Sequence, residues 1–514
     1  MKRAALRPTN KDLRRMNASF SAPVLGWNTR DSLVSMDPRF ARVLDNMVVD
    51  GGRVGTRKGF AQVAASAVLP ESVAAYDYNG TKKLFACADN KICTLNTAQH
   101  TLEPVGSGYL NNRWRTVFYK GNLYFLNGQD PVQVYNGQTL AAAQFTHSGE
   151  TEQEPLDTAL FTGGCLYRNR LFFIERDSLK FWYTQDAGAV QGPLLSFDLA
   201  QLSRLGGRLV CVAAWTHSGL GAQESQLVFI TSEGEAFVYA GDNPSEMNAW
   251  ALRGTYKIPR PLGQKCVCAV GGDLAYLAED GYYMLSQLLS APSAQKAAAF
   301  SDAINPTLAE LKNSFANYGW QVLAYQPDGL LIVNVPQTGA DIVQHVMNLQ
   351  TGAWSRFTGL SALDWAELDG KLYFCGTGGI YQAQTGQSDN GQSIRARFMG
   401  AYGNLGSPYA KILKEVQLYY QGPNEMRFDV NVSVDFKREL TAYQSNPPAP
   451  KSAWDVSPWD KTPWGAEATA VKKRMIVKMS QGTYFSFGIS CTLLDMNVKI
   501  LGYDVFFERS KNLA

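Results

Sequence analysis

The sequence lacks long apolar runs and an excess of charge of one sign. No stretch approaches the ~20 apolar residues that a helix needs to cross a bilayer, and the basic N-terminus has no apolar signal-peptide core. We therefore expect a soluble chain that is not secreted through a signal peptide. Its 48 basic and 45 acidic residues leave a net charge of +3. A balance this close to neutral does not mark the whole chain as a nucleic-acid-binding or membrane-surface protein, so any contact with DNA must be local.

Cysteines in metal-binding or disulfide patterns are also lacking. The eight cysteines lie in strand-like runs, and Cys266-Val267-Cys268 has no second Cys or His pair at a matching offset. Free cysteines of this kind are typical small core residues of a protein made in a reducing cytosol. We therefore expect no metal and no cofactor.

Motifs for catalysis are absent as well. The sequence has no Gly-x-Ser-x-Gly elbow, no phosphate-binding Gly-x-x-x-x-Gly-Lys loop, no calcium loop and no sialidase-type turn. Thr-His-Ser-Gly occurs at 146–149 and 216–219, but neighbouring side chains of an extended segment point in opposite directions, which favours turn residues over a His-Ser pair. Carboxylates are expected in turns between strands. They are Glu233, Asp280, Asp364, Glu367 and Asp369. The sequence predicts no catalytic residue and no enzyme.

What the sequence has is a repeat. A short apolar strand centred on a leucine, a polar turn and a second aromatic strand recur about seven times. The leucines are Leu84, Leu123, Leu171, Leu227, Leu274, Leu330 and Leu372, at spacings of 39 to 56 residues. Such periods are typical of propeller blades, and the 46 Gly, 24 Tyr and 25 Phe favour short strands and tight turns. The predicted fold is mostly β: a β-propeller of about seven blades, with six or eight as alternatives, and a β-rich platform domain.

The predicted domains are an N-terminal arm and platform segment at 1–70, the propeller at 71–393 and a C-terminal β domain, also platform, at 394–514. Asp37-Pro38 predicts a short helix over 38–46, and Gly51-Gly52 predicts a turn into a strand at 53–57. The alternation over 430–436 predicts a strand with one buried and one solvent-facing side.

An insertion at 290–317 is predicted to be helical, because Asn305-Pro306 is a helix-start signal and apolar residues follow at helical spacing. Packing against the rim of the propeller is favoured over a role in docking a partner.

Two terminal features suggest contacts with other molecules. The basic residues of the first segment face only Asp12, and they form either a solvated arm or an arm that contacts DNA or another acidic surface. These residues are Lys2, Arg3, Arg7, Lys11, Arg14 and Arg15. Further on, Trp454, Trp459 and Trp464 recur every five residues beside prolines. Exposed tryptophans are unfavourable in water, so we expect this loop to lie on the chain's own sheet or on another subunit, with a carbohydrate-stacking site as a third possibility.

Several segments at both ends and in the middle of the sequence resemble those of a known protein family. The segments are Pro23–Asp31, Ala41 with Leu44–Asn46, Gly51–Phe60, Val228–Tyr239, Lys473–Val477 and Val505–Glu508. Together they resemble the tail nozzle, or packaged-DNA stabilisation, proteins of short-tailed bacteriophages. The resemblance implies a six-fold ring below the portal and its adaptor ring, with duplex DNA passing down the axis and tail fibres or spikes attached outside. It also implies a virion-tail protein that resides in the host cytoplasm during assembly and that helps to stabilise packaged DNA.

In that setting the candidate residues for subunit or adaptor contacts are Arg53, Arg57, Lys58, Phe60, Trp454, Trp459 and Trp464. A lumen that conducts DNA should contact it only weakly, because phosphate contacts by Lys and Arg accumulate affinity and resist sliding. The alternatives are a glycan-binding or glycan-cleaving propeller and an intracellular hub that binds peptides. The mass of the purified chain with and without adaptor rings separates these hypotheses.

Overall fold

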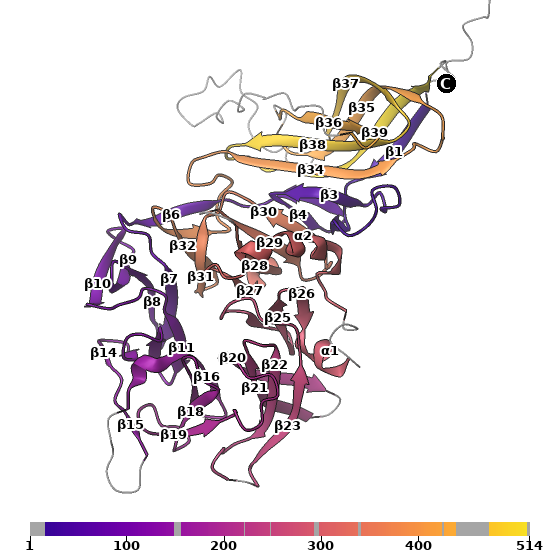
Figure 1. The fold of residues 1–514 in the computed structure, drawn as a ribbon. Coiled ribbons are helices and arrows are strands. Elements are labelled where there is room, and N and C mark those ends of the chain that lie inside the picture. The colour runs from indigo at the N-terminus through magenta and orange to yellow at the C-terminus, as the bar shows by residue number, and fades with distance from the viewer. Residues whose placement is uncertain are drawn as a thin grey trace, which may run out of the picture. The chain divides into compact units, whose positions relative to one another are not determined.

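The computed structural model describes residues 16–148, 156–219, 222–246, 248–291, 298–337, 341–423, 426–437 and 472–510. The fold is mostly β, with many small antiparallel sheets (Figure 1). The chain divides into unit 1 (Met1–Gly59, Met347–Phe357 and Gly386–Ala514) and unit 2 (Phe60–Val346 and Thr358–Thr385). In the part of the chain that the structure describes, no helix has the length and apolarity needed to span a membrane.

Unit 2 contains seven groups of mostly antiparallel strands in chain order, here called the first to seventh sheets; the sixth is one end of a nine-stranded sheet, and the other six are separate sheets. The first sheet contains β7 (Ser72–Tyr78), β8 (Thr81–Ala88), β9 (Lys91–Asn96) and β10 (Thr101–Ser107). The second contains β11 (Arg115–Tyr119), β12 (Asn122–Leu126), β13 (Gln133–Tyr135) and β14 (Leu140–Ala142). The third contains β16 (Phe161–Tyr167), β17 (Arg170–Glu175), β18 (Lys180–Thr184) and β19 (Gly192–Asp198), with β15 (Phe145–His147) parallel to β19. The fourth contains β20 (Leu209–Gly219), β21 (Ala222–Thr231), β22 (Glu235–Gly241) and β23 (Trp250–Lys257).

The remaining three sheets follow the same plan. The fifth has β24 (Val267–Val270), β25 (Asp273–Ala278) and β26 (Gly281–Met284). The sixth contains β27 (Gln321–Tyr325), β28 (Leu330–Pro336) and β29 (Ile342–Asn348). The seventh contains β31 (Ala362–Leu368), β32 (Lys371–Gly376), β33 (Gly379–Ala383) and β6 (Phe60–Ala65). Each of the seven predicted leucines lies in the second strand of a different sheet, so the predicted repeat unit is confirmed as a structural unit.

The second strands read as continuous apolar runs because both of their faces are buried. All seven residues of β28 are buried, as are the first five of β17. Consecutive sheets supply the cover: one apolar cluster joins the third and fourth sheets, where the rings of Phe181 and Phe229 stack with centroids 4.3 Å apart. Other clusters join the first and second sheets, the second and third, and the seventh and first. Sheets covered on both faces lose the in–out alternation of a half-exposed sheet.

The first strands of the seven sheets contact one another in chain order. The contacts run from β7 through β11, β16, β20, β24 and β27 to β31, and β31 contacts β7. The last sheet is completed from the other end of the unit, because β6 pairs antiparallel with β33 in the register Ala383↔Phe60. The outermost strand of the seventh sheet therefore comes from the residues that precede the first sheet.

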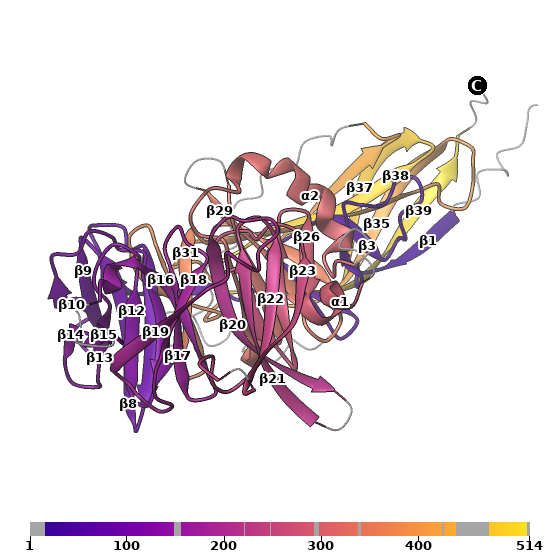
Figure 2. The same cartoon turned by 60° about the horizontal axis from the view of Figure 1, so that its bottom comes forward.

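Several turns between first and second strands have left-handed backbone at both central residues. Asn79-Gly80, Lys120-Gly121, Arg168-Asn169 and Asp369-Gly370 all have positive φ, between 43° and 79°. Two such residues make the tight hairpin turn whose twist matches that of the flanking strands. Figure 2 shows the β20–β21 hairpin continuing beyond the rest of its sheet, since β20 and β21 pair as far as Gly219↔Ala222 whereas β22 begins to pair at Gln226.

Unit 1 is built from two β-sheets that pack face to face. One has the order β37-β35-β39-β5-β4, with β1 also paired to β39; the other contains β30-β2-β3-β34-β38-β36. Phe20 and Tyr503 of the first sheet contact Phe487 of the second, with ring centroids 6.1 and 6.0 Å away. The strands of the first sheet are β1 (Met16–Ser21), β4 (Met47–Asp50), β5 (Arg53–Thr56), β35 (Lys411–Gln421), β37 (Lys472–Gly482) and β39 (Lys499–Arg509). Those of the second are β2 (Gly26–Trp27), β3 (Phe40–Asp45), β30 (Trp354–Phe357), β34 (Ile394–Gly403), β36 (Asp429–Val434) and β38 (Phe485–Leu493).

Two local predictions for unit 1 are wrong. The predicted helix over 38–46 is the strand β3, which pairs with β2 and β34; the Asp37 carboxylate caps the backbone N–H of Arg39 at 2.9 Å, but sheet pairing outweighs the helix-start signal. In β36 both faces are buried, because Asn431 and Ser433, on the face predicted to be solvent-facing, are themselves buried. Their polar groups have partners: Asn431 donates to Ser490 Oγ at 3.2 Å, and Ser433 accepts from Arg42 Nη2 at 3.0 Å. The predicted turn at Gly51-Gly52 and the strand after it are confirmed as the β4–β5 hairpin.

Short helical elements occur within the predicted insertion at 290–317. They are α2 (Asn305–Glu310) and the 3-10 turns η3 (Asp302–Ile304) and η4 (Lys312–Ser314). The helix α1 (Leu285–Ser290) directly precedes the insertion, and η1 (Thr158–Leu160) and η5 (Gln326–Asp328) lie elsewhere. Pro306 occupies the first turn of α2 as predicted, but Asn305 is the first helical residue rather than its cap. Leu308 is fully buried. The apolar face of α2 therefore packs on its own unit, as the favoured interpretation predicts.

Candidate functional site

Part of the predicted contact surface lies outside the described residues. This applies to the basic arm, with Lys2, Arg3, Arg7, Lys11, Arg14 and Arg15, and to the loop with Trp454, Trp459 and Trp464. The hypotheses on these two segments stay predictions. The described candidates are Arg53, Arg57, Lys58 and Phe60.

Arg57 is buried inside unit 1, where its guanidinium has partners of its own. Nη2 and Nη1 form ion-paired hydrogen bonds to the two carboxylate oxygens of Asp389 at 2.6 and 2.8 Å, and Nε donates to Asn46 Oδ1 at 2.8 Å. Only 1% of the Arg57 side chain is exposed. A bidentate pair with this geometry is strongly held, so Arg57 joins the segment after β5 to the segment after β33 rather than presenting a charge to solvent.

The neighbouring candidates have other surroundings. Lys58 is exposed, and Arg53 is half-buried with Nη1 3.2 Å from Gln421 Oε1. Phe60 begins β6 in unit 2, where its ring makes edge-on contacts with Phe374 and Tyr381 at centroid distances of 5.4 and 5.3 Å. The structure therefore does not gather the four candidates into one surface: Arg53 and Lys58 lie in unit 1 on either side of the buried Arg57, and Phe60 anchors the strand that completes the seventh sheet.

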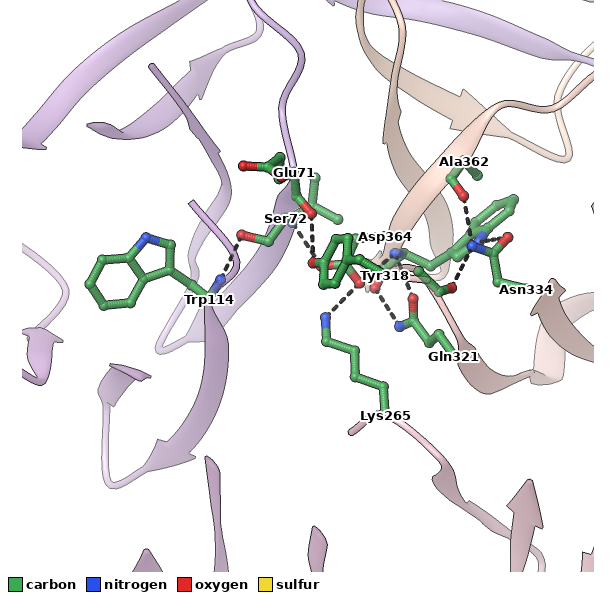
Figure 3. Close-up of polar contacts among 12 residues, drawn as sticks. Glu71, Ser72, Trp114, Lys265, Tyr318, Gln321, Asn334, Ala362 and Asp364 are labelled. Carbon is green, nitrogen blue, oxygen red and sulfur yellow. Dashed lines mark hydrogen bonds and ion pairs between the residues drawn. The ribbon is translucent and has the colours of Figure 1, made fainter. Parts of the chain in front are cut away.

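A group of polar residues, most of them buried, gathers where the first strands of unit 2 meet and is here named the first-strand polar cluster (Figure 3). Glu71 and Trp114 take part through their backbone groups. The members of the cluster come from five of the seven sheets or from the segments that lead into them. They are Glu71, Ser72, Trp114, Lys265, Tyr318, Gln321, Asn334, Gln344, Asp364 and Trp365. The sequence predictions missed this cluster. The available signal was polar residues inside otherwise apolar strands, such as Asn334 in β28.

Asp364 is the charged member at the centre of these contacts. Its Oδ1 accepts from Lys265 Nζ at 2.5 Å and from the backbone N–H of Trp365 at 2.9 Å, while Oδ2 accepts from the backbone N–H of Val73 at 3.0 Å. The Asp364 side chain is 1% exposed, and the Lys265 side chain is 27% exposed. One carboxylate thus joins the first strand of the seventh sheet to the first strand of the first sheet and to the segment before the fifth.

This position corrects a prediction about the carboxylates. Asp364 and Glu367 lie within β31 and not in a turn, whereas Glu233, Asp280 and Asp369 lie in turns as predicted. A carboxylate that accepts three hydrogen bonds from its own fold has the surroundings of a structural ion pair. Its role here is to hold first strands together.

The amide side chains of the cluster extend these links. Asn334 Nδ2 donates to the carbonyls of Gly319 and Ala362 at 2.8 and 2.7 Å, and Asn334 Oδ1 accepts from Trp365 Nε1 at 3.2 Å. Gln321 exchanges two hydrogen bonds with the Trp365 backbone. Apart from the bond to Gly319, which stays within the sixth sheet, these bonds cross from the sixth sheet to the seventh, so the side chains supply a connection that backbone pairing does not.

A second set of bonds joins the first, second and sixth sheets. Ser72 Oγ donates to the carbonyl of Asn112 at 2.6 Å and accepts from the backbone N–H of Trp114 at 3.1 Å. Tyr318 Oη donates to the carbonyl of Glu71 at 2.7 Å, and the guanidinium of Arg113 lies over the Tyr318 ring at 4.4 Å. Burial, helped by the nearby charge of Asp364, raises the pKa of Tyr318 well above its usual value, so this hydroxyl stays protonated and remains a donor.

The described part of the chain contains no group of three or more His, Cys, Asp or Glu side chains that could hold a metal ion. Three histidines lie in separate surroundings within it. His345 is buried with Nδ1 3.1 Å from Tyr282 Oη, the His147 ring packs edge-on against Trp182, and His100 Nδ1 lies 3.0 Å from the Val63 carbonyl. All eight cysteines are free thiols, six of them buried, which agrees with the prediction of core cysteines.

A shallow groove of about 430 Å³ lies beside β1 in the described part of unit 1. It is lined by residues 19–21 of β1, by Tyr419 of β35 and by residues 501–504 of β39. Tyr419 Oη donates to Asp504 Oδ2 at 2.7 Å. The hydrogen bond to this carboxylate raises the pKa of Tyr419, so the groove presents a neutral phenol already engaged with its neighbour.

Comparisons with known proteins assign no family to the chain. No protein-family model matches it, and no curated protein matches it. Among solved structures it is similar to a computationally designed protein, Ika8, with 13% identity, a TM-score of 0.34 and coverage of 70% of this chain and 99% of that chain. It is also similar to a chain of a mitotic checkpoint complex, with 10% identity, a TM-score of 0.35 and coverage of 64% and 93%. Likenesses with TM-scores this low do not establish a shared fold.

Proposed function

We propose that the chain is a structural protein of a short bacteriophage tail. In this proposal six copies form a ring, the nozzle, below the portal and its adaptor. The ring closes off the packaged DNA, conducts it during ejection with weak contacts only, and anchors tail fibres or spikes. The proposal rests on the sequence resemblance to the tail nozzle family.

One structural observation carries the proposal furthest. The opening and closing segments that give the resemblance meet in a single sheet of unit 1, since Gly55 and Val54 of β5 pair with Lys499 and Ile500 of β39. A platform made from both ends of the chain is what the resemblance implies. Two of the residues proposed to contact an adaptor or a neighbouring copy, the exposed Lys58 and the half-buried Arg53, belong to this unit.

Within the same proposal, unit 2 is a seven-bladed β-propeller. Three observations support it: seven sheets in chain order, contacts among first strands that return from β31 to β7, and a last sheet completed by β6. The strand β6 comes from the beginning of unit 2 and pairs in the last sheet, so it links the two ends of the unit without a covalent bond. The first-strand polar cluster supports the same arrangement, because it joins five of the sheets at their first strands. Such a scaffold suits a rigid spacer.

The mass of the purified full chain, alone and mixed with portal–adaptor complexes, tests the proposed function. We expect about six copies to join each adaptor complex, whether or not the free chain is a monomer. Lys58→Glu should weaken this assembly while the protein stays folded, because it reverses an exposed charge of unit 1. The matched control is Lys257→Glu, the same change at an exposed lysine of β23 in unit 2. A chain that stays monomeric, does not bind the adaptor and binds or cleaves surface glycans would refute the proposal and favour a glycan-binding or glycan-cleaving propeller.

A further inference from the structure

The strand β1 lies at an edge of the sheet of unit 1 that contains β37, β35 and β39, and it lacks the features that usually protect such an edge. It pairs on one side with β39, from Met16↔Phe507 to Ser21↔Gly502, and with no other strand among the described residues. Its register with β39 has no shift, and its sequence, Met-Asn-Ala-Ser-Phe-Ser, contains no charge and no proline. Charged residues, prolines and bulges are the usual means by which edge strands avoid pairing with other chains. β1 is therefore an unprotected edge.

The pairing with β39 determines which backbone groups of β1 point away from the sheet. The N–H of Ala22 donates to the carbonyl of Leu501 at 3.1 Å, and these two residues continue the register as an opposing pair. Hydrogen-bonded and non-hydrogen-bonded pairs alternate along antiparallel strands. The N–H and C=O groups of Asn17, Ser19 and Ser21 therefore point to the open side of β1, and all three residues are exposed. Such a row of backbone donors and acceptors is a template for another strand.

The opposite edge of the same sheet is β37. Among the described strands β37 pairs only with β35, and its eleven residues are enough to cover the six residues of β1. Neighbouring strands from β1 through β39 and β35 to β37 are antiparallel, so β1 and β37 run in opposite directions. A second copy of β37 laid against β1 would therefore be antiparallel to it and would continue the alternation of strand directions in the sheet.

We propose that β1 of one copy pairs with β37 of a neighbouring copy, so that the sheet continues from one subunit into the next. Two different edges of identical chains then meet in a head-to-tail contact, and repeated contacts of this kind close into a ring when the rotation between copies permits it. Closure into a ring of six rests on the proposed function. The pairing of the two edges follows from the sheet itself.

Other segments of the chain suit the open side of β1 less well. Residues 1–15 contain Pro8 and seven charged residues, and residues 438–471 contain five prolines. Proline cannot donate a hydrogen bond to a strand ladder. Two copies of β37 would also pair poorly with each other, because like charges on opposing strands are destabilising and each copy carries four basic residues in this strand. They are Lys472, Lys473, Arg474 and Lys478. The uncharged β1 avoids this repulsion.

Photo-cross-linking of the full chain, alone and with portal–adaptor complexes, tests the contact. A benzophenone side chain replaces that of Ser19, which is exposed, and ordinary and isotope-labelled copies are mixed before irradiation. We expect mixed-isotope cross-links that join the β1 peptide to residues 472–482. Cross-links within one copy, or mixed-isotope cross-links from β1 to another part of the chain, including a second β1, would overturn the proposal.

Ser19→Pro should prevent the pairing between copies and leave β1 in its own sheet, because the N–H that proline removes points away from β39. We expect the dissociation constant for self-association to rise by roughly 10-fold or more, since the contact loses at least one backbone hydrogen bond and meets the proline ring. The matched control is Ser19→Thr, which keeps the N–H and should assemble as the wild type does. Hydrogen exchange checks the fold: the amide of Phe20 should stay protected in both variants, whereas the amide of Ser21 should become protected only when copies assemble.

Failure of the β1–β37 contact is distinguishable from failure of the proposed function. Copies that gather on the adaptor without cross-links between β1 and residues 472–482 would refute the contact and leave the proposed function standing. Copies that show these cross-links and do not bind the adaptor would support the contact and refute the proposed function. A chain that is monomeric under every condition would refute both. If Ser19→Pro fails to fold, the cross-linked peptides still decide.

Discussion

Replacing Asp364 with asparagine is expected to lower the free energy of unfolding by about 2–4 kcal/mol. The substitution removes the charge that faces Lys265 Nζ at 2.5 Å, and it places an N–H₂ group where the carboxylate accepts three donors. At least one buried donor then loses its acceptor. Because the Lys265 side chain is 27% exposed and can be hydrated, the loss should lie toward the lower end of the range for a broken buried ion pair.

Asp369→Asn is the matched control for this prediction. Asp369 lies in the turn of the same sheet and also pairs with a lysine, Lys82, but 56% of its side chain is exposed. Asparagine tolerates its left-handed backbone, where φ is 55°. An exposed, hydrated ion pair contributes little to stability. Urea unfolding of both variants, with hydrogen exchange to locate the change in unit 2, should show a much larger effect for Asp364. Equal effects would refute the role assigned to the polar cluster.

Replacing Gly379 with alanine is expected to destabilise the seventh sheet by about 2–5 kcal/mol. Gly379 has φ of 140°, and an added Cβ would lie 2.1 Å from the carbonyl oxygen of Ala64 in β6. The clash is with backbone that cannot rotate away, so relief requires β6 to separate from β33. The amides of β6 should then exchange faster with solvent, and the link between the beginning and end of unit 2 should open.

Gly370→Ala serves as the control for the closing strand. Gly370 lies in the β31–β32 turn with φ of 66°, and an added Cβ there meets no atom within 4 Å. Only the backbone strain remains, at a cost of about 1 kcal/mol. Hydrogen exchange should show protected β6 amides in this variant and exposed ones in Gly379→Ala. If β6 remained protected in Gly379→Ala, the pairing of β6 with β33 would not be what closes the unit.

The repeat could be predicted from the sequence because one physical pattern marks it. Second strands buried on both faces need continuous apolar residues, and turns on either side need glycine, asparagine or aspartate. Both signals are local: the strands β17 and β28, which contain Leu171 and Leu330, are apolar runs that can be recognised from their own residues. Each of the seven leucines lies in the second strand of its group.

The errors and omissions concern residues whose partners are distant in sequence. Asp37-Pro38 signals a helix locally, but pairing with β34, more than 350 residues away, makes β3 a strand. The sequence gives no local sign that β6 completes the seventh sheet or that Asp364 meets Lys265 and Val73. Arg57 was predicted at an interface for the same reason, since nothing near it reveals Asp389. Unit 1 is likewise assembled from distant parts of the chain, Met1–Gly59, Met347–Phe357 and Gly386–Ala514, and no local feature of the sequence indicates that the middle segment belongs to it.

Electron microscopy of virions that carry a label on a C-terminal tag of this chain tests the central claim most directly. The account predicts label on the tail, below the capsid, in several copies around the tail axis, and it predicts that particles without the chain fail to keep their DNA. Intact and infectious particles that lack the chain, or label found away from the tail, would contradict it.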